Sequence, residues 1–206
     1  MYINWLSFRG YRDLRASRSA STRLVLVRHG QDADNSHSII NGRRDTPLTD
    51  LGRSQAATIP DDLRSENISC IYSSPLQRAH QTASIIAGRL GIEDLHIHPD
   101  LIERDYGILT GCSVSDIPKL AGRLFVSHGF KYVIQAAGIE EYANLWARAG
   151  RVLRKIREQH PGETVLVVAH NEILKMMRAN ANQRPWEDEL LRAPMGHCQL
   201  IAIDIA

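Results

Sequence analysis

The sequence predicts an α/β fold, a three-layer α/β/α sandwich whose helices cover both faces of a mostly parallel central sheet. Apolar, β-branched runs at 23–27, 68–72 and 164–169 have the length and composition of strands. Segments with helical spacing separate these runs along the chain. Strands that alternate with helices in this way are typical of parallel sheets.

The ends of the first two helices are marked by capping residues. Thr49 is expected to cap a helix that Pro60 stops. Ser74 and Gln77 form a capping-box pattern that predicts the start of the next helix, and Gly91 closes it. The other expected elements are a strand at 95–98, a loop-rich stretch at 100–120, helices at 139–159 and 172–179, and a strand at 199–205.

The chain of 206 residues is long enough for one domain, which we expect to span 23–206. Residues 1–22 form a basic N-terminal arm or targeting segment, because they are rich in Arg and Ser and contain Asp13 as their one acid. Such a composition fits an organelle transit peptide, and a solvated tail or docking arm is the alternative. The three sparse cysteines favour a reducing compartment, so we expect a cytoplasmic protein, with targeting to an organelle through the N-terminus as the alternative.

The composition disfavours several classes of partner. A net charge of +2 gives no argument for nucleic acid or an anionic membrane, and no apolar run approaches the length of a membrane span. Cys70, Cys112 and Cys198 stand far apart without metal-ligand spacing, so free thiols and no metal are expected. No organic cofactor is expected either. The oligomeric state stays open, with a homodimer as one alternative.

Parallel strands end at a common edge of the sheet, and ligands bind outside that edge. Polar side chains follow four predicted strands there: Arg28 and His29, Ser74 and Arg78, Glu103, and His170. We therefore expect the sheet to bring these groups into one site. Two arginines, two histidines and a carboxylate suit phosphoryl transfer through a covalent intermediate.

Arg28 and Arg78 are suited to bind a phosphate monoester, which carries roughly two negative charges at neutral pH. Guanidinium groups offer planar, paired donors to phosphate oxygens, and the N-terminus of the helix carrying Arg78 adds backbone N–H groups. His170 can donate a further hydrogen bond. For any one of these residues alone, a surface ion pair or a structural role is the alternative.

A neutral His29 can attack phosphorus in line and become a phosphohistidine. A carboxylic acid must protonate the departing alkoxide, and its carboxylate can later take a proton from water. Glu103 is the first candidate for this acid, and Asp105 is the second. The remaining histidines show no ligand spacing and are interpreted as structural or surface residues: His37, His80, His96, His98, His128, His160 and His197.

From about Arg23 to the C-terminus, the chain resembles the histidine phosphatase superfamily, the phosphoglycerate mutase-like proteins. The matching motifs are LVLVRHGQ at 24–31, IYSSPLQRAHQTA at 71–83, LIERDYG at 101–107 and VVAH at 167–170. The resemblance implies His29 as nucleophile, Glu103 as general acid/base, and a phosphate pocket of Arg28, Arg78 and His170, with Asn35 as an added contact. It also implies that no metal or organic cofactor is needed.

Three positions depart from the family pattern. Asp32 stands where Thr or Ser is common, and Asp34 stands where an aromatic residue is common. Two extra acids should weaken the binding of highly charged substrates, unless they point away or pair with Arg43 and Arg44. Asn171 replaces the usual glycine after His170 and can add a contact to the substrate.

The resemblance leaves three functions to compare. A phosphomonoester hydrolase acting on a small phosphorylated metabolite is favoured, because the segment between Glu103 and His170 is short and rich in glycine. A 2,3-bisphosphoglycerate-dependent phosphoglycerate mutase is the alternative, and it would have to exclude water from its intermediate. A non-catalytic docking module is disfavoured because no pocket residue is missing. The segment 113–142 is expected to form the wall that selects the substrate. Its candidates for contact with a second anionic group are Lys119, Arg123, His128 and Lys131, and solvation at the surface is the alternative for them.

Overall fold

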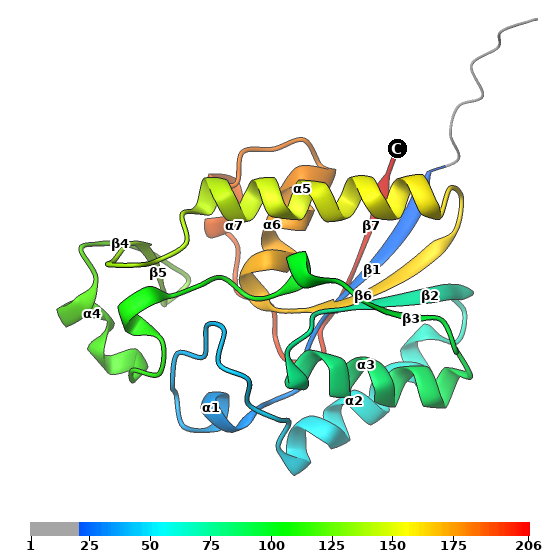
Figure 1. The fold of residues 1–206 in the computed structure, drawn as a ribbon, viewed down its shortest axis with the longest axis horizontal. Helices are drawn as coiled ribbons and strands as arrows, with labels where there is room; N and C mark the ends of the chain where they lie inside the picture. Colours follow the sequence, from blue (N-terminus) through cyan, green and yellow to red (C-terminus); the bar gives the residue numbers. More distant parts are fainter. Residues whose placement is uncertain (1–20) are drawn as a thin grey trace, which may run out of the picture.

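The computed structural model describes residues 21–206, and it confirms the predicted fold class (Figure 1). A five-stranded sheet in the order β3-β2-β6-β1-β7 forms the centre. Its strands are β1 (Thr22–Arg28), β2 (Ile68–Ser73), β3 (Leu95–Ile97), β6 (Thr164–Ala169) and β7 (Leu200–Ile205). Every pairing is parallel except that of β1 with β7.

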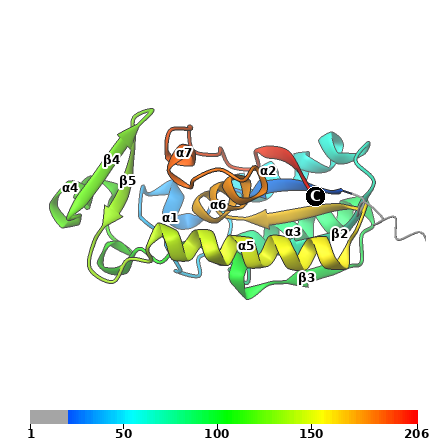
Figure 2. The same ribbon diagram turned by 90° about the horizontal axis from the view of Figure 1, so that it is seen from above.

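Helices cover both faces of this sheet, as the sequence predicts. The helices are α1 (Ala33–Ser36), α2 (Asp50–Leu63), α3 (Gln77–Leu90), α4 (Ile117–Leu120), α5 (Tyr142–Gln159), α6 (Asn171–Ala181) and α7 (Glu187–Leu190). Helices α5 and α6 lie on one face, and α2 and α3 lie on the other (Figures 1 and 2). None of the helices within 21–206 combines the length and apolar content needed to cross a bilayer.

The central strand β6 belongs to both halves of the core. Val165, Val167 and Ala169 pack with the side chains of α5 and α6. Leu166 and Val168 point the other way and pack with those of α2 and α3. Successive side chains of a strand point to opposite faces, so a continuous apolar run is what a strand covered on both sides requires.

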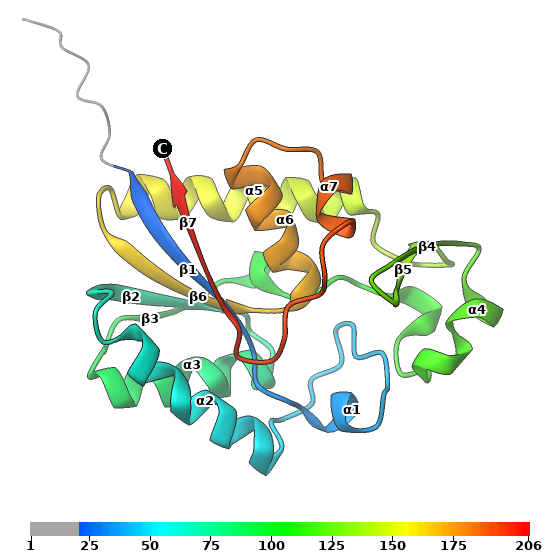
Figure 3. The same ribbon diagram turned by 180° about the vertical axis from the view of Figure 1, so that it is seen from behind.

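A second, two-stranded sheet lies beyond the carboxyl ends of the central strands, beside α4 (Figure 3). It is a hairpin of β4 (Arg123–Ser127) and β5 (Phe130–Gln135), which the sequence analysis left unassigned. His128 and Gly129 form its turn with φ of 48° and 72°, the backbone that a tight hairpin turn requires. We call residues 113–142, which carry the hairpin, the lid segment.

Pro60 does not stop α2, and this part of the prediction is wrong. The helix begins at the expected cap, where Thr49 Oγ1 accepts from the Gly52 amide, but it continues to Leu63. Ile59, Pro60 and Leu63 are all buried. Their packing on the core offsets the backbone hydrogen bond that proline cannot make.

The capping box predicted for α3 is also wrong. The helix begins at Gln77, and its first amide donates to Asp45 Oδ1 at 2.6 Å. The cap therefore comes from a distant loop, whereas Ser74 Oγ accepts from the Leu76 amide at 3.3 Å and contacts His170 Nε2. The other end follows the prediction, because Gly91 ends α3 with φ of 70°.

The loop after β1 packs its backbone directly on the start of α2. A Cβ atom on Gly52 would lie 2.0 Å from Gln31 O, and one on Gly30 would lie 2.4 Å from Gly52 O. Only glycine allows this close approach. The contact holds the backbone of Gly30 and Gln31, directly after His29, against the first turn of α2. The predicted arm, 1–22, lies outside the described residues except for its last two, and Thr22 already belongs to β1.

Candidate active site

The carboxyl ends of β1, β2 and β6 lie side by side, where the polar side chains are predicted to converge. The register pairs Arg28 of β1 with Ala169 of β6, so His29 and His170 follow side by side. The His29 amide continues the ladder by donating to Ala169 O at 3.0 Å. The two imidazole rings pack edge to face with their centroids 5.0 Å apart. The sheet itself therefore sets the spacing of the histidines.

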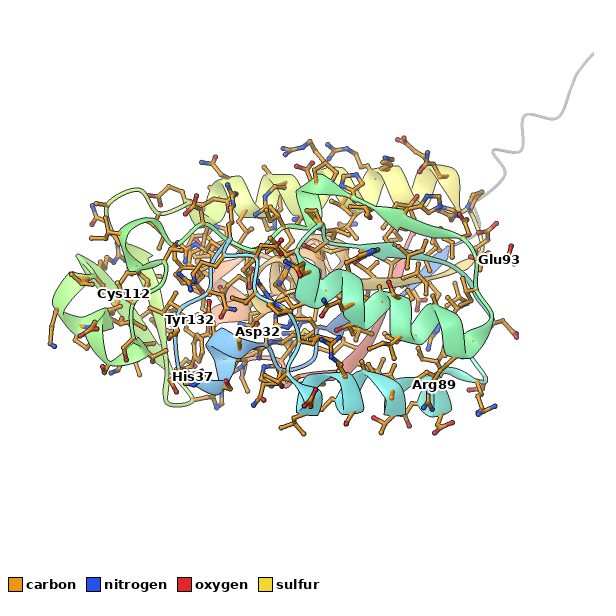
Figure 4. The ribbon with its side chains drawn as sticks, turned by 60° about the horizontal axis from the view of Figure 1, so that its bottom comes forward. Asp32, His37, Arg89, Glu93, Cys112 and Tyr132 are labelled. Carbon is orange, nitrogen blue, oxygen red and sulfur yellow. The ribbon has the colours of Figure 1, made fainter. Side chains whose placement is uncertain are left out.

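A cavity of about 350 Å³ opens at this edge of the sheet. Its polar lining residues include Arg28, His29, Asn35, Asn41, Arg78, Glu103 and Asn171. Its apolar lining residues include Ile39, Ile40, Val114, Ile117, Phe130 and Pro194, and the lid segment also contributes Lys131. Figure 4 shows Asp32 between Cys112 and Tyr132 on one side and Arg89 and Glu93 at the far end.

The orientation of His29 leaves one nitrogen free to react. Its Nδ1 lies 2.7 Å from the carbonyl oxygen of Gly30. A carbonyl can only accept, so Nδ1 carries the proton and Nε2 carries the lone pair. Burial, and then the positive charges of Arg78 and Arg28, hold the pKa of His29 well below its ordinary value. The ring is therefore neutral at physiological pH, as a nucleophile must be.

Arg78 is fully buried in the pocket wall, with only 1% of its surface exposed. Its Nη2 donates to Gly42 O at 2.9 Å, its Nη1 donates to Arg44 O, and its Nε donates to His170 Nδ1 at 3.2 Å. Asp32 Oδ2 lies 3.4 Å from the same Nε. The guanidinium therefore joins α3, the loop after β1 and the end of β6.

His170 lies behind the cavity and is completely buried. Since Arg78 donates to its Nδ1, the proton of the neutral ring is on Nε2, which donates to Ser74 Oγ at 2.7 Å. Burial and the charge of Arg78 hold the pKa of His170 well below its ordinary value. Donation to a phosphate, as the sequence predicts, requires the Nε2 proton to leave Ser74.

Arg28 lines the cavity from the end of β1. Its Nη1 donates to Met195 O, which anchors the guanidinium to the segment before β7. Its buried Nε has no hydrogen-bond partner among the described residues. A buried donor without a partner is costly, so this group is poised for an anionic ligand.

Glu103 lies at the N-terminus of α6. Its carboxylate accepts from the Arg104 amide at 2.8 Å, and at 3.4 Å from the amides of Glu172 and Ile173. Burial, followed by the charge of Glu172, raises the pKa of Glu103. The rival candidate, Asp105, does not line the cavity and pairs with a surface arginine instead.

Glu172 is a site residue that the sequence analysis missed. It is buried beside Glu103, where it accepts from Tyr142 Oη at 2.8 Å and from Asn171 Nδ2 at 2.7 Å. A buried carboxylate near a second one makes ionisation of that neighbour harder. The available signal was its place directly after Asn171, where an acid opens the helix that follows His170.

Asn41, Asn35 and His197 form a hydrogen-bonded chain, and the two asparagines line the cavity. Asn35 Nδ2 donates to Asn41 Oδ1 at 3.1 Å, and His197 Nε2 contacts Asn35 Oδ1 at 2.9 Å. Burial lowers the pKa of His197 to about 4, so its ring is neutral and donates here. The sequence analysis placed Asn35 at the site but interpreted His197 as structural.

The two extra acids of the first motif have different surroundings. Asp34 pairs with Arg44 at 2.7 Å. This pairing is one of the two arrangements expected to keep its negative charge from weakening the binding of an anionic substrate. Asp32 is buried, its Oδ1 accepts from the Asn35 amide at 2.8 Å, and its Oδ2 has no hydrogen-bond partner among the described residues. The same oxygen lies 3.9 Å from His29 Nδ1. Asp32 thus places a negative charge beside the cations of the pocket.

Asn171 lines the cavity, but the protein already occupies much of its amide. Its Oδ1 accepts from the Met195 amide at 2.9 Å, while its Nδ2 donates to Glu172. Its main contacts therefore fix the segment before β7 and the carboxylate of Glu172. A contact with substrate, as the sequence predicts, would have to be made in addition to these.

Comparison with known proteins places the chain among phosphatases and mutase-like proteins. A model of the histidine phosphatase superfamily (branch 1) matches residues 24–206. Phosphoglycerate mutase-like protein 4 of Arabidopsis thaliana is 34% identical over 170 residues, which cover 80% of this chain and 74% of that protein. The metal-independent phosphoserine phosphatase of the same plant is 32% identical over 180 residues, covering 85% and 75%.

A solved structure is also similar to this chain. The mycobacterial glucosyl-3-phosphoglycerate phosphatase in complex with VO3 superposes with a TM-score of 0.75 at 25% identity. The match covers 87% of this chain and 91% of that one. The region matched by the family model contains every residue that lines the cavity.

The position of Asp32 predicts an effect on anion affinity. Asp32→Asn keeps a side-chain oxygen for the Asn35 amide but removes the negative charge next to Arg78. We expect inorganic phosphate and vanadate to bind about tenfold more tightly, equivalent to about 1.4 kcal/mol. Inhibition constants measured side by side test this. Asp61→Asn, on the exposed side of α2, removes the same net charge and should change nothing; unchanged or weaker binding in Asp32→Asn contradicts the prediction.

Proposed function

The chain belongs to the histidine phosphatase superfamily, branch 1, as a phosphatase, and we propose that it hydrolyses small phosphomonoesters through a phosphohistidine on His29. The observation that supports this mechanism most strongly is the orientation of His29. Its Nδ1 is bound to Gly30 O, its Nε2 is free, and both pocket arginines lower its pKa. A reactive nitrogen and two cations thus meet in one cavity.

Binding of the phosphate group is the first step. Arg28 and Arg78 both line the cavity and supply its positive charge. Guanidinium groups bind phosphate oxygens with charge-assisted hydrogen bonds. Asn35 lines the same cavity. The pocket residues thereby neutralise the phosphate that His29 approaches.

In the second step, the lone pair of His29 Nε2 forms a bond to phosphorus while the bond from phosphorus to the ester oxygen breaks. The departing alkoxide takes the proton of the Glu103 carboxyl group. Burial and Glu172 raise the pKa of Glu103, which increases the protonated fraction that can serve as acid. The products of this step are the alcohol and a phosphohistidine.

In the third step, the Glu103 carboxylate takes a proton from a water molecule whose oxygen attacks phosphorus. The bond between phosphorus and His29 Nε2 breaks, and its electron pair returns to the ring. Inorganic phosphate leaves, and both residues regain their starting protonation states. The phosphomonoester and one water molecule are therefore the only reactants that these steps need.

For the substrate, we propose a phosphorylated small acid with a carboxylate close to its phosphate. The cavity of about 350 Å³ accommodates a small metabolite, and Lys131 of the lid segment adds a further cation to its lining. The relatives named as a phosphoserine phosphatase and a glucosyl-3-phosphoglycerate phosphatase support this class. The mutase alternative receives less support, because a mutase must exclude water and the lid segment between Glu103 and His170 is short, with β4, β5 and the short α4 as its main elements.

His29→Ala tests the mechanism. We expect turnover of p-nitrophenyl phosphate to fall by at least about a thousandfold, because no other side chain replaces the nucleophile. The matched control is His37→Ala, an exposed histidine on the outside of the same loop, which should retain activity (Figure 4). Substantial turnover in His29→Ala overturns the mechanism. Primer-dependent conversion of 3- to 2-phosphoglycerate by the wild type, faster than its hydrolysis, would identify a mutase instead.

Glu172→Gln tests the origin of the raised pKa of Glu103. Removing the neighbouring charge makes the Glu103 anion easier to form, so its pKa falls. At a given alkaline pH less of the acid remains protonated, and the alkaline limb of kcat/KM for an alkyl phosphate therefore moves to lower pH. The control is Glu187→Gln, an exposed acid of α7. A limb that stays in place or moves to higher pH would show that Glu172 does not act on Glu103.

Lys131→Met tests the proposed substrate class. We expect KM for O-phosphoserine to rise roughly fivefold, which corresponds to about 1 kcal/mol for a solvent-exposed ion pair. KM for p-nitrophenyl phosphate, which lacks the carboxylate, should stay the same. Lys119→Met is the matched control, because Lys119 pairs with Asp116 and does not line the cavity. Equal changes in KM for both substrates would show that Lys131 does not bind the substrate carboxylate. The phosphohistidine mechanism does not depend on this result.

A further inference from the structure

A second cluster of reactive side chains lies on the α5 face of the sheet, away from the cavity. Cys70 on β2, His96 on β3 and His160 at the C-cap of α5 each place a ligand atom within 4.8 Å of the others. The register explains part of this, because Tyr72 pairs with His96 and Cys70 lies two residues before Tyr72. Residues at these positions point to the same face of a sheet.

The spacing of the cluster matches that of ligands around one ion. A tetrahedral zinc ion binds sulfur at about 2.3 Å and nitrogen at about 2.0–2.1 Å, so two such ligand atoms lie about 3.6 Å apart. Cys70 Sγ lies 3.7 Å from His160 Nε2. Because Cys70 Sγ lies equally far, at 3.7 Å, from His160 Nδ1, the imidazole ring has to turn so that Nε2 points at the shared ion. His96 has the freedom to adjust because 43% of its side chain is exposed.

Each histidine of the cluster is already held by a carboxylate. His160 Nδ1 lies 3.0 Å from Glu163, and His96 Nε2 lies 2.9 Å from Asp94. Metal-binding histidines typically have such a partner, which orients the ring and makes the other nitrogen a better ligand. His160 Nε2 and His96 Nδ1 are the nitrogens left for an ion.

One contact would have to be exchanged when an ion binds. Tyr72 Oη lies 3.1 Å from His160 Nε2, but it also donates to Gln159 Oε1 at 2.9 Å. The hydroxyl therefore keeps a partner when His160 Nε2 turns to a metal. The rearrangement is local and leaves no buried polar group unpaired.

We propose that Cys70, His96 and His160 form a binding site for a zinc-like divalent cation, with solvent in the fourth position. As the bond from sulfur to the ion forms, the bond from sulfur to hydrogen breaks and the proton passes to solvent. Burial raises the pKa of the free Cys70 thiol to about 11, so binding becomes stronger as pH rises. Asp94 and Glu163 add negative charge around the ion.

The proposed ion would hold the edge of the sheet to the end of α5. Strand β3 has only three residues and pairs with β2 alone, so a bond from His96 to the ion adds a tie to α5. The start of β3 follows Glu93, which lies at the end of the molecule opposite Cys112 and Tyr132 (Figure 4). The site shares no residue with the cavity lining, and its role is independent of the phosphatase mechanism.

Titration of the chelator-treated full-length protein with Co²⁺ tests this proposal, because a thiolate bound to Co²⁺ absorbs light through charge transfer from sulfur. We expect this absorption in the wild type and its loss in Cys70→Ser. Cys112→Ser and Cys198→Ser are the matched controls and should retain it; Cys198 follows His197 and reports on any ion bound near the pocket histidines. Competition with Zn²⁺ gives the affinity for the expected metal.

Two further variants keep the test decisive if Cys70→Ser folds poorly. His96→Asn changes a half-exposed ligand and should weaken Zn²⁺ binding by more than about tenfold, and Asp94→Asn, which removes the carboxylate partner, should weaken it about tenfold to a hundredfold. Absence of thiolate absorption in the wild type overturns the site. So does absorption that Cys70→Ser leaves intact, or Zn²⁺ affinity that neither of the other variants changes.

Discussion

The buried guanidinium of Arg78 is the interaction on which the whole pocket depends. It binds the carbonyls of Gly42 and Arg44 in the loop after β1, and it also binds His170 at the end of β6. Helix α3 carries Arg78, so one side chain joins three segments that are distant in sequence. A buried charge needs such partners, and breaking them would leave it uncompensated. The same contacts that fold the loop therefore place a cation where the phosphate is expected.

The electrostatics of the site follow from this arrangement. Burial and then the charges of Arg78 and Arg28 lower the pKa of His29 and keep its ring neutral, whereas the burial of Glu103 beside Glu172 raises the pKa of that acid. A neutral nucleophile and a protonated acid are the forms that the first chemical step needs. Asp32, close to His29 and Arg78, reduces the positive charge of the pocket and distinguishes this chain from the family pattern.

Much of the fold and most of the pocket could be predicted because their signals are local. Strand β6 has the predicted bounds, since its apolar run is long and covered on both faces. The hairpin β4–β5 was missed because its burial does not alternate regularly along either strand. The prediction that Pro60 ends α2 was wrong because packing outweighed the helix-breaking tendency of proline. The group of Cys70, His96 and His160 could not be predicted, because only the folded sheet brings these residues together. Glu172 was missed although its place after Asn171 was a signal, because its effect on Glu103 depends on their proximity in the fold.

The central claim is that the phosphate passes through a covalent bond to His29. The most direct measurement is to quench the enzyme rapidly during turnover of O-phosphoserine and to map the phosphate on peptides by mass spectrometry. We expect phosphate on the peptide that contains His29, stable in alkali and lost in acid, as is typical of a phosphoramidate. Phosphate on Ser74, which lies beside His170 in the same pocket, or steady turnover with no phosphoenzyme at all, would contradict it.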